Sequence, residues 1–155
     1  MTDRQSLVEK LGGLAADLDA HIVTAESLTS GAIASALGQG PDAATWFRGG
    51  IVAYKEQVKF DVLGVPEGPV VTEQAAEQMA RGARDLFSAN WAVAVTGVGG
   101  PGPNEGEPAG TVWMAVVTDD HVVTRKVHLD GDPADVVEKT VDASLELLHE
   151  VLQEG

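Results

Sequence analysis

A cluster of polar side chains stands where a strand is expected to give way to a helix, in the stretch TAESLTSG. An acid, Glu26, is followed by the hydroxyls of Ser27, Thr29 and Ser30, and then by Gly31. Such hydroxyls can simply cap the helix, whose first N–H groups lack partners. The same N–H groups and the helix dipole also attract anions, so the segment can instead form one wall of a ligand site. The sequence leaves both interpretations open, and in the second Glu26 could orient a sugar hydroxyl or a water molecule.

A glycine-rich segment, TGVGGPGPNEGEPAG, follows an apolar run further along the chain. Glycine lets a backbone approach a ligand closely and turn its N–H groups toward an anion. The segment lacks the Gly-Lys-Ser/Thr of a phosphate-binding loop, and a strand rather than a helix is expected after it. It is either a flexible surface connection or a ligand cradle. The residues predicted to contact a ligand here are Thr96, Gly97, Gly99, Gly100 and Pro101.

A third segment, WFRGGIVAYKEQVK, combines a tyrosine with several bases. Tyr54 and Lys59 are spaced so that a strand end and the first turn of a helix could bring both to one cleft. A buried lysine whose pKa is lowered can act as a general base beside a hydroxyl. Arg48, in the same stretch, is a candidate anion contact. The alternative is an ordinary surface lysine and a tyrosine that merely ends a strand.

The composition excludes several classes of partner. The 155-residue chain carries 24 acidic and ten basic side chains, and its formal net charge is −14. Nucleic acids and anionic membrane surfaces both require a basic face, so neither is expected as a partner. No run reaches the roughly 18 apolar residues that a membrane span requires. The chain lacks cysteine, which fits a cytoplasmic location, and its four scattered histidines do not predict a metal site.

Helical and apolar strand-like patterns alternate along the chain, whose length fits one domain over residues 1–155. The predicted helices span 5–18, 29–38, 55–63, 72–88 and 133–152. The predicted strands span 20–25, 49–54, 91–96, 111–118 and 122–129, and the last two read as a hairpin joined at Asp119, Asp120 and His121. The helix over 72–88 is predicted to bury Ala76, Met79, Ala83, Leu86 and Phe87.

This alternation favours a central sheet with helices on both faces, in which ligands bind beyond the carboxyl ends of the strands. Three loops are therefore candidates for a site: 26–31, 40–48 and 97–110.

Taken together, three segments resemble the CinA carboxy-terminal domain family, whose active members are PncC-like nicotinamide mononucleotide deamidases. These segments read TAESLTSG, DAATWFRGGIVAYKEQVK and TGVGGPGPNEGEPAGTVW here, and their order and spacing agree over nearly the whole chain. The resemblance implies a three-layer α/β/α sandwich with a mixed, mostly parallel sheet and one antiparallel strand. It also implies a bacterial protein of pyridine nucleotide salvage that needs no cofactor, binds a nucleotide-like small molecule and assembles as a homo-oligomer, with a dimer as the first guess.

The family reaction cleaves the carboxamide of nicotinamide mononucleotide to give nicotinate mononucleotide and ammonia. The resemblance places the family tyrosine on Tyr54 and the family lysine on Lys59, while the nucleophilic serine falls on Ala44. Thr45 carries the nearest hydroxyl, one residue out of register, and is kept as a catalytic candidate.

Further departures concern charge. Glu107 replaces a family lysine, and Pro133 and Val137 replace two family arginines.

Three hypotheses follow from the sequence. The first is an amidohydrolase with a relocated nucleophile, Thr45 or Ser27, or with a water activated by Lys59. The second is a catalytically silent relative that binds a nucleotide or another small ligand in the same cleft. The third is a structural or regulatory protein that uses a dimer surface.

Overall fold

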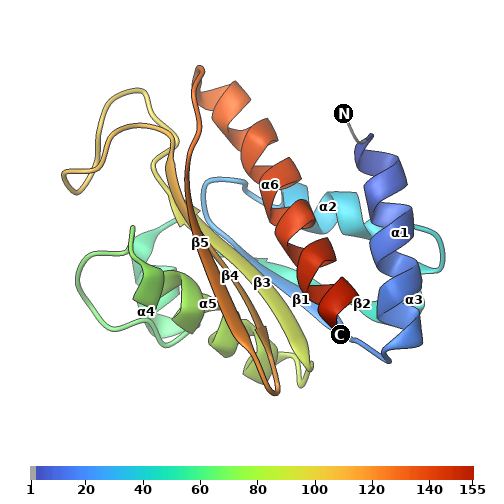
Figure 1. Ribbon diagram of the computed structural model, residues 1–155. Helices are drawn as coiled ribbons and strands as arrows, with labels where there is room; N and C mark the ends of the chain where they lie inside the picture. The colour runs from blue at the N-terminus through green and yellow to red at the C-terminus, as the bar shows by residue number, and fades with distance from the viewer. Residues whose placement is uncertain (1–2) are drawn as a thin grey trace.

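Residues 3–155 fold around a single five-stranded sheet with the strand order β2-β1-β3-β4-β5. A computed structural model describes residues 3–155, so the first two residues of the predicted domain lie outside the described part. The strands are β1 (Ile22–Glu26), β2 (Phe47–Val52), β3 (Trp91–Gly97), β4 (Thr111–Thr118) and β5 (Val122–His128). The helices are α1 (Arg4–Asp17), α2 (Ala32–Gly38), α3 (Ala43–Trp46), α4 (Glu56–Asp61), α5 (Glu73–Leu86) and α6 (Pro133–Glu154) (Figure 1).

The sheet is mixed, as predicted. Strand β1 pairs in parallel with β2 and β3, whereas β4 runs antiparallel to both β3 and β5. Four strands therefore share one direction and β4 alone is reversed, which confirms the predicted fold class. The predicted hairpin is formed by β4 and β5, where the backbone N–H groups of Asp120 and His121 donate to the Thr118 hydroxyl in the turn.

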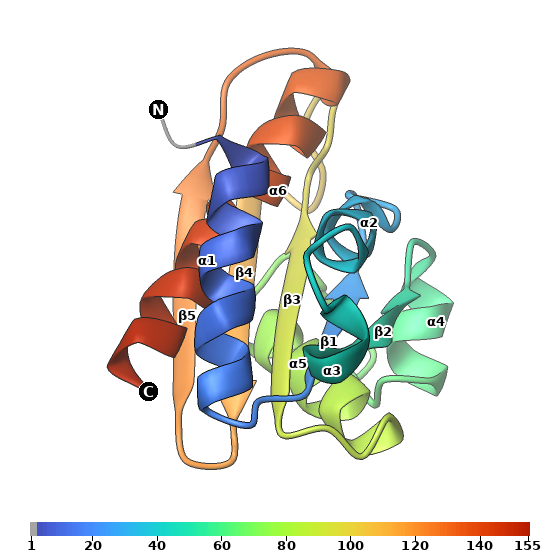
Figure 2. The ribbon, with the colours of Figure 1, turned by 90° about the vertical axis from the view of Figure 1, so that its right-hand side faces the viewer.

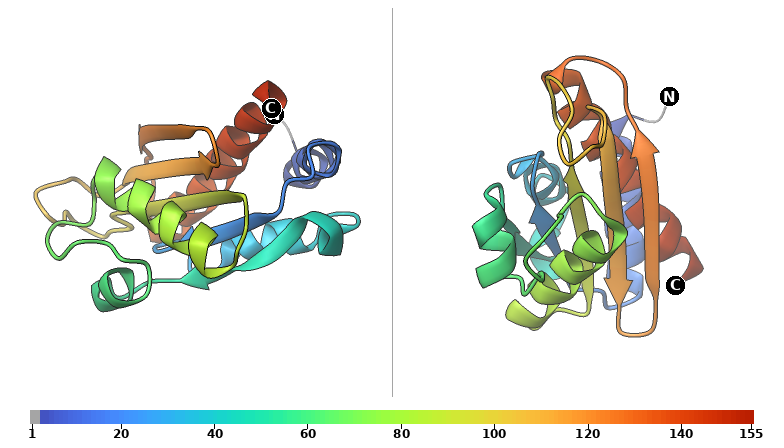
Figure 3. Two further views of the ribbon diagram at one scale, coloured as in Figure 1. Left: turned by 90° about the horizontal axis from the view of Figure 1, so that it is seen from below. Right: turned by 90° about the vertical axis from the view of Figure 1, so that its left-hand side faces the viewer.

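Helices cover both faces of the sheet and make three layers. Helices α1, α2, α3 and α6 share one apolar cluster with one sheet face, and α5 shares a second cluster with the other. Figure 2 shows α1 and α6 side by side. In the right panel of Figure 3, α5 lies in front of the strands while α1 and α6 lie behind them.

Strand β3 explains how two cores fit on one sheet. Its side chains alternate between large and small: Trp91, Val93 and Val95 enter the α6 cluster, while Ala92 and Ala94 enter the α5 cluster. Every residue from Trp91 to Thr96 is buried, as expected of a central strand covered on both faces. The small residues let α5 lie close to the sheet.

Several predicted boundaries were wrong by a few residues. The helix predicted over 29–38 begins only at Ala32, and the strand predicted over 49–54 is Phe47–Val52. The short helix α3 was not predicted. Leu86, predicted to be buried, is 56% exposed and is the last residue of α5.

The parallel strands bring two of the three predicted site loops, 26–31 and 97–110, to one edge of the sheet. The carboxyl ends of β1, β2 and β3 meet there, and α6 begins there after β5. The third loop, 40–48, was placed wrongly, because it precedes β2 and so lies at the opposite edge. In Figure 1 the yellow glycine-rich loop extends from the sheet near the start of α6. Among residues 3–155, no helix is both long enough and apolar enough to cross a membrane.

Candidate active site

A cleft of about 320 Å³ opens at this carboxyl edge. It is lined by the turn after β1, the β2–α4 connection, residues 70–71, the glycine-rich loop and the first turns of α6. Eight of the predicted site residues lie in its walls. They are Ser27, Tyr54, Lys59, Thr96, Gly97, Gly99, Gly100 and Pro101.

Lys59 is the most unusual side chain of this cleft. It lies on α4, is only 2% exposed, and its Nζ donates a hydrogen bond of 2.9 Å to the carbonyl of Ala53. Burial lowers the pKa of Lys59, and the carboxylates of Glu56 and Glu105 partly oppose this effect. A lysine with a lowered pKa holds a neutral amine more readily at physiological pH, which is the form that can accept a proton.

Two hydroxyl side chains accompany Lys59. Ser27 is 7% exposed and lines the cleft. Within residues 3–155 its hydroxyl oxygen makes no hydrogen bond. That oxygen is also not fully buried, because every fully buried side-chain oxygen in this range has a hydrogen-bond partner. Tyr54 lies at the mouth and is 70% exposed. A free serine hydroxyl and a buried lysine in one cleft are the elements of a serine–lysine nucleophile pair.

The glycine-rich loop contributes backbone donors. Val98 and Gly110 bond across its base, since the Val98 N–H donates to Thr111 and the Gly110 N–H donates to Val98. Within residues 3–155, the N–H groups of Gly99, Gly100 and Gly102 have no protein acceptor. Gly100 has a positive φ of 83°, a conformation that other residues avoid. These N–H groups are donors that a bound carbonyl oxygen can use.

The Thr96 hydroxyl is already engaged. It donates a hydrogen bond of 2.8 Å to the carbonyl of Val70 and ties the end of β3 to the segment before α5. Thr96 lines the cleft, but its hydroxyl is used to hold the cleft wall in place.

Glu26, predicted as a ligand contact, caps α2 inside the protein instead. Its carboxylate is 1% exposed and accepts hydrogen bonds from the hydroxyls of Thr24 and Thr29. It also accepts from the backbone N–H groups at the start of α2, those of Gly31, Ile33 and Ala34. Thr29, Ser30 and Gly31 are likewise absent from the cleft lining. Since its oxygens are filled by the helix, Glu26 orients the turn that carries Ser27.

Thr45 and Arg48 lie away from the cleft within one chain, near the beginning of β2 at the opposite edge of the sheet. The Thr45 hydroxyl donates to the carbonyl of Asp42. Arg48 donates to the carbonyls of Phe87 and Ser88, just beyond α5. Ala44, where the family pattern has a serine, is exposed in the same region. The structure therefore separates Thr45 from Tyr54 and Lys59, which were predicted to act with it.

Several residues of the cleft were not among the predicted site residues. Glu56 lines it from α4, and Pro133 and Val137 line it from α6. Glu105 was also missed: its carboxylate accepts from the N–H groups of Val70 and Val71 and so fastens the loop across the cleft. The loop supplies Glu105 from 34 residues away, and nothing in the local sequence signals that contact.

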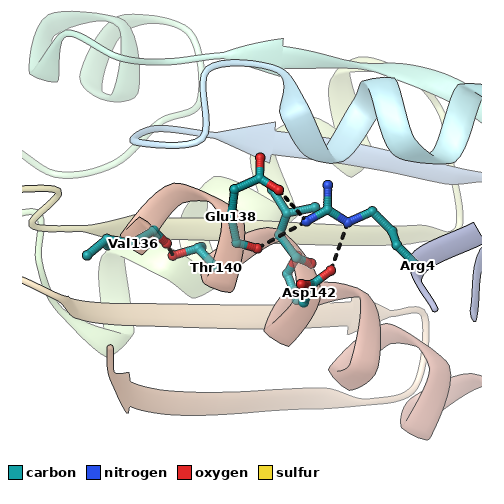
Figure 4. Close-up of polar contacts among 7 residues, drawn as sticks. Arg4, Val136, Glu138, Thr140 and Asp142 are labelled. Carbon is teal, nitrogen blue, oxygen red and sulfur yellow. Dashed lines mark hydrogen bonds and ion pairs between the residues drawn. The ribbon is translucent and has the colours of Figure 1, made fainter. Parts of the chain in front are cut away.

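A larger groove, of about 680 Å³, lies between α1, α2 and α6, and no predicted site residue lines it. Arg4 closes part of this groove through bonds to Glu138 and Asp142, which Figure 4 shows. The groove therefore holds ion-paired side chains rather than a group poised for chemistry. Among residues 3–155, no three His, Asp or Glu side chains are grouped as metal ligands.

The chain is similar to known proteins over most of its length. The chain is 40% identical to the nicotinamide-nucleotide amidohydrolase PncC of Pseudomonas putida over 147 residues, which cover 91% of this chain and 92% of that protein. It is 39% identical over 145 residues to a CinA-like protein of Frankia casuarinae, covering 90% of this chain and 34% of that protein. The chain thus spans about a third of the length of the CinA-like relatives it matches.

The solved structures include a CinA superfamily protein of Enterobacter cloacae. It superposes with a TM-score of 0.94 at 33% identity, over 98% of this chain and 94% of that one. The sequence pattern of the CinA C-terminal domain matches residues 4–152. This chain therefore belongs to the CinA C-terminal domain family.

Proposed function

We propose that this protein hydrolyses a small pyridine carboxamide in the cleft, with Lys59 as general base and Ser27 as nucleophile. The observation that carries the proposal is the burial of Lys59 in the cleft wall with a lowered pKa. The relative of Pseudomonas putida, named as a nicotinamide-nucleotide amidohydrolase, supports the same type of reaction. The cytoplasmic location and the place in nucleotide salvage expected from the sequence belong to this proposal.

The reaction can be written with the residues at hand. The neutral amine of Lys59 takes the proton of the Ser27 hydroxyl as its oxygen attacks the carboxamide carbon. The N–H groups of Gly99 and Gly100 stabilise the negative oxygen of the tetrahedral intermediate. The Lys59 ammonium then returns the proton to the leaving nitrogen, which departs as ammonia, and water hydrolyses the acyl-serine ester.

Ammonia release from nicotinamide mononucleotide, nicotinamide riboside and nicotinamide tests this proposal. We expect turnover by the wild type, and a loss of at least about 100-fold in Lys59→Met and in Ser27→Ala, the usual scale of acid–base catalysis. Lys55→Met and Ser35→Ala are matched controls, because both residues are exposed and outside the cleft lining. The absence of ammonia release from all three substrates would contradict the proposal. Full activity in Ser27→Ala would mean that a water molecule, and not Ser27, is the nucleophile.

Binding without turnover is the second candidate function, and Ala44 favours it. A methyl group stands where the family pattern has a serine. Isothermal titration calorimetry with the same three compounds separates the candidates, since a silent relative binds but releases no ammonia. A gain of turnover in Ala44→Ser would support the hypothesis that the wild type binds a ligand without hydrolysing it. Since position 44 lies away from the cleft within one chain, such a gain would require a second copy of the chain to bring the new serine to the cleft.

A further inference from the structure

The cleft offers an anionic ligand little positive charge. In the part of the chain that the structure describes, the charged side chains of its lining are Glu56 and Lys59. The Lys59 side chain is 2% exposed, its Nζ already donates to the carbonyl of Ala53, and its lowered pKa favours the neutral amine, so it offers a bound anion little positive charge. A phosphate monoester carries about two negative charges at neutral pH and is usually met by arginine or by several N–H donors.

One pair of backbone donors in the cleft wall is already occupied by a carboxylate of the chain itself. Glu105 takes the N–H groups of Val70 and Val71, which lie in the cleft wall. A phosphate would otherwise find paired donors at this position, which already holds a negative charge.

The wall formed by α6 excludes an anion in the same way. Its two lining residues, Pro133 and Val137, are apolar. The helix begins with a reciprocal capping box, in which the Asp135 N–H donates to Asp132 and the Asp132 N–H donates to Asp135. Two carboxylates therefore stand at the helix end whose dipole would favour a phosphate.

The groups that remain open suit neutral oxygens and a cation. The N–H groups of Gly99, Gly100 and Gly102 have no protein acceptor in residues 3–155, and the hydroxyls of Ser27 and Tyr54 face the same cleft. Because no exposed cationic side chain stands beside them in the described lining, these donors fit a carboxamide oxygen and sugar hydroxyls better than a doubly charged phosphate. The Glu56 carboxylate fits a positive charge such as a pyridinium ring.

We infer that the cleft selects a phosphate-free pyridinium nucleoside carboxamide over the corresponding nucleotide. The inference takes from the proposed function only that the ligand carries a carboxamide, and it does not require that the ligand is hydrolysed. It assigns Val137 and Pro133, together with the capping carboxylates of Asp132 and Asp135 at the start of α6, as the residues that set this specificity.

Calorimetric titration of the wild type with nicotinamide riboside and with nicotinamide mononucleotide is the direct test. We expect the riboside to bind at least about tenfold more tightly. Equal or tighter binding of the mononucleotide would overturn the inference, and so would the absence of riboside binding.

A charge introduced into the α6 wall tests the assigned residues. Val137→Arg should tighten mononucleotide binding by about tenfold and leave riboside binding unchanged or weaker, because only the mononucleotide carries a phosphate for the new guanidinium. The matched control is Gln153→Arg, which adds the same charge at an exposed position of the same helix. If the two variants had equal effects on mononucleotide binding, or no effect, Val137 and Pro133 would not set the specificity.

Failure of this inference and failure of the proposed function give different results. Preferential riboside binding without ammonia release supports the selectivity and contradicts the hydrolase. Ammonia release from the mononucleotide, at an efficiency equal to that from the riboside, supports the hydrolase and contradicts the selectivity.

Discussion

Glu26 illustrates how one residue can bear chemistry without touching a ligand. Its buried carboxylate accepts five hydrogen bonds, two from threonine hydroxyls and three from N–H groups of the α2 region. A buried carboxylate is tolerated only when its oxygens are filled in this way. Since Ser27 follows directly in the chain, the same contacts hold the candidate nucleophile in place.

Glu26→Gln should therefore lower the free energy of unfolding. The amide NH₂ would face N–H donors, leaving several of them unsatisfied, and we expect a loss of about 2–3 kcal/mol. Urea unfolding at neutral pH measures it. Glu67→Gln, in an exposed loop, removes the same charge and should change stability by less than about 0.5 kcal/mol. An equal loss of stability in the two variants would mean that the Glu26 hydrogen bonds add nothing to the free energy of unfolding beyond the effect of the charge.

Lys59 predicts a pH dependence of stability whose sign can be worked out. Its pKa in the folded protein lies below the ordinary value of 10.5, chiefly because of burial. Between these two pKa values the unfolded chain binds the extra proton, so the Lys59 contribution to stability rises as pH increases through that window. Below the lowered pKa both states are protonated and the contribution no longer changes with pH.

The measurement compares wild type with Lys59→Met by urea unfolding at about pH 8 and about pH 10, just below the unfolded-state pKa. The stability of the wild type relative to the variant should increase toward the higher pH. The Lys55→Met protein is the control, because it removes the same charge at an exposed position. A relative stability that falls with pH would contradict the lowered pKa.

At the scale of elements, the close approach of α5 to the segment that follows α4 depends on a glycine. A Cβ added at Gly82 would lie 2.2 Å from the carbonyl oxygen of Leu63, which is backbone and cannot give way cheaply. Gly82→Ala should therefore destabilise the protein by about 2–3 kcal/mol, the usual scale of an overpacked core. Thermal or urea unfolding provides the measurement.

Gly13→Ala is the matched test for that prediction. Gly13 also lies inside a helix, α1, but a Cβ there meets nothing within 4 Å. Alanine should stabilise this site by up to about 1 kcal/mol, because it is the better helix former. If both variants were stabilising, the contact between α5 and Leu63 would not constrain the packing.

Elements with strong periodicity were predictable from sequence, and their ends were less so. Strand β4 was predicted over 111–118 and is found there, because its residues 112–117 form an unbroken apolar run and turn residues follow it. The start of α2 was misplaced because Gly31, with φ near 98°, delays the helix while Glu26 caps it from a distance. Such a cap from five to eight residues away leaves no local signature.

At the scale of the whole molecule, the sheet decides which predicted site residues meet. Tyr54 and Lys59 follow β2, so they share the carboxyl edge with Ser27 and the glycine-rich loop. Thr45 and Arg48 stand near the beginning of β2, so the length of one strand separates them from that cleft. Spacing in the sequence grouped all these residues, but only the strand direction distinguishes the two edges.

The acidity of the whole molecule carries the last prediction. A formal net charge of −14 spread over 155 residues means that folding brings like charges together, and self-repulsion then destabilises the compact state. Salt shortens the range of that repulsion to a few ångströms. Raising NaCl from about 20 mM to about 300 mM should therefore increase stability by about 1 kcal/mol, which corresponds to about 2–4 °C in Tm for a chain of this size.

Thermal unfolding in NaCl and in choline chloride at matched ionic strength provides the measurement. Equal shifts in the two salts identify screening, whereas a shift in NaCl alone identifies specific binding of sodium. Surface ion pairs such as that of Arg4 with Glu138 are weakened by the same salt. A Tm that falls as salt rises would mean that these pairs outweigh the net repulsion, contrary to what an excess of fourteen negative charges leads us to expect.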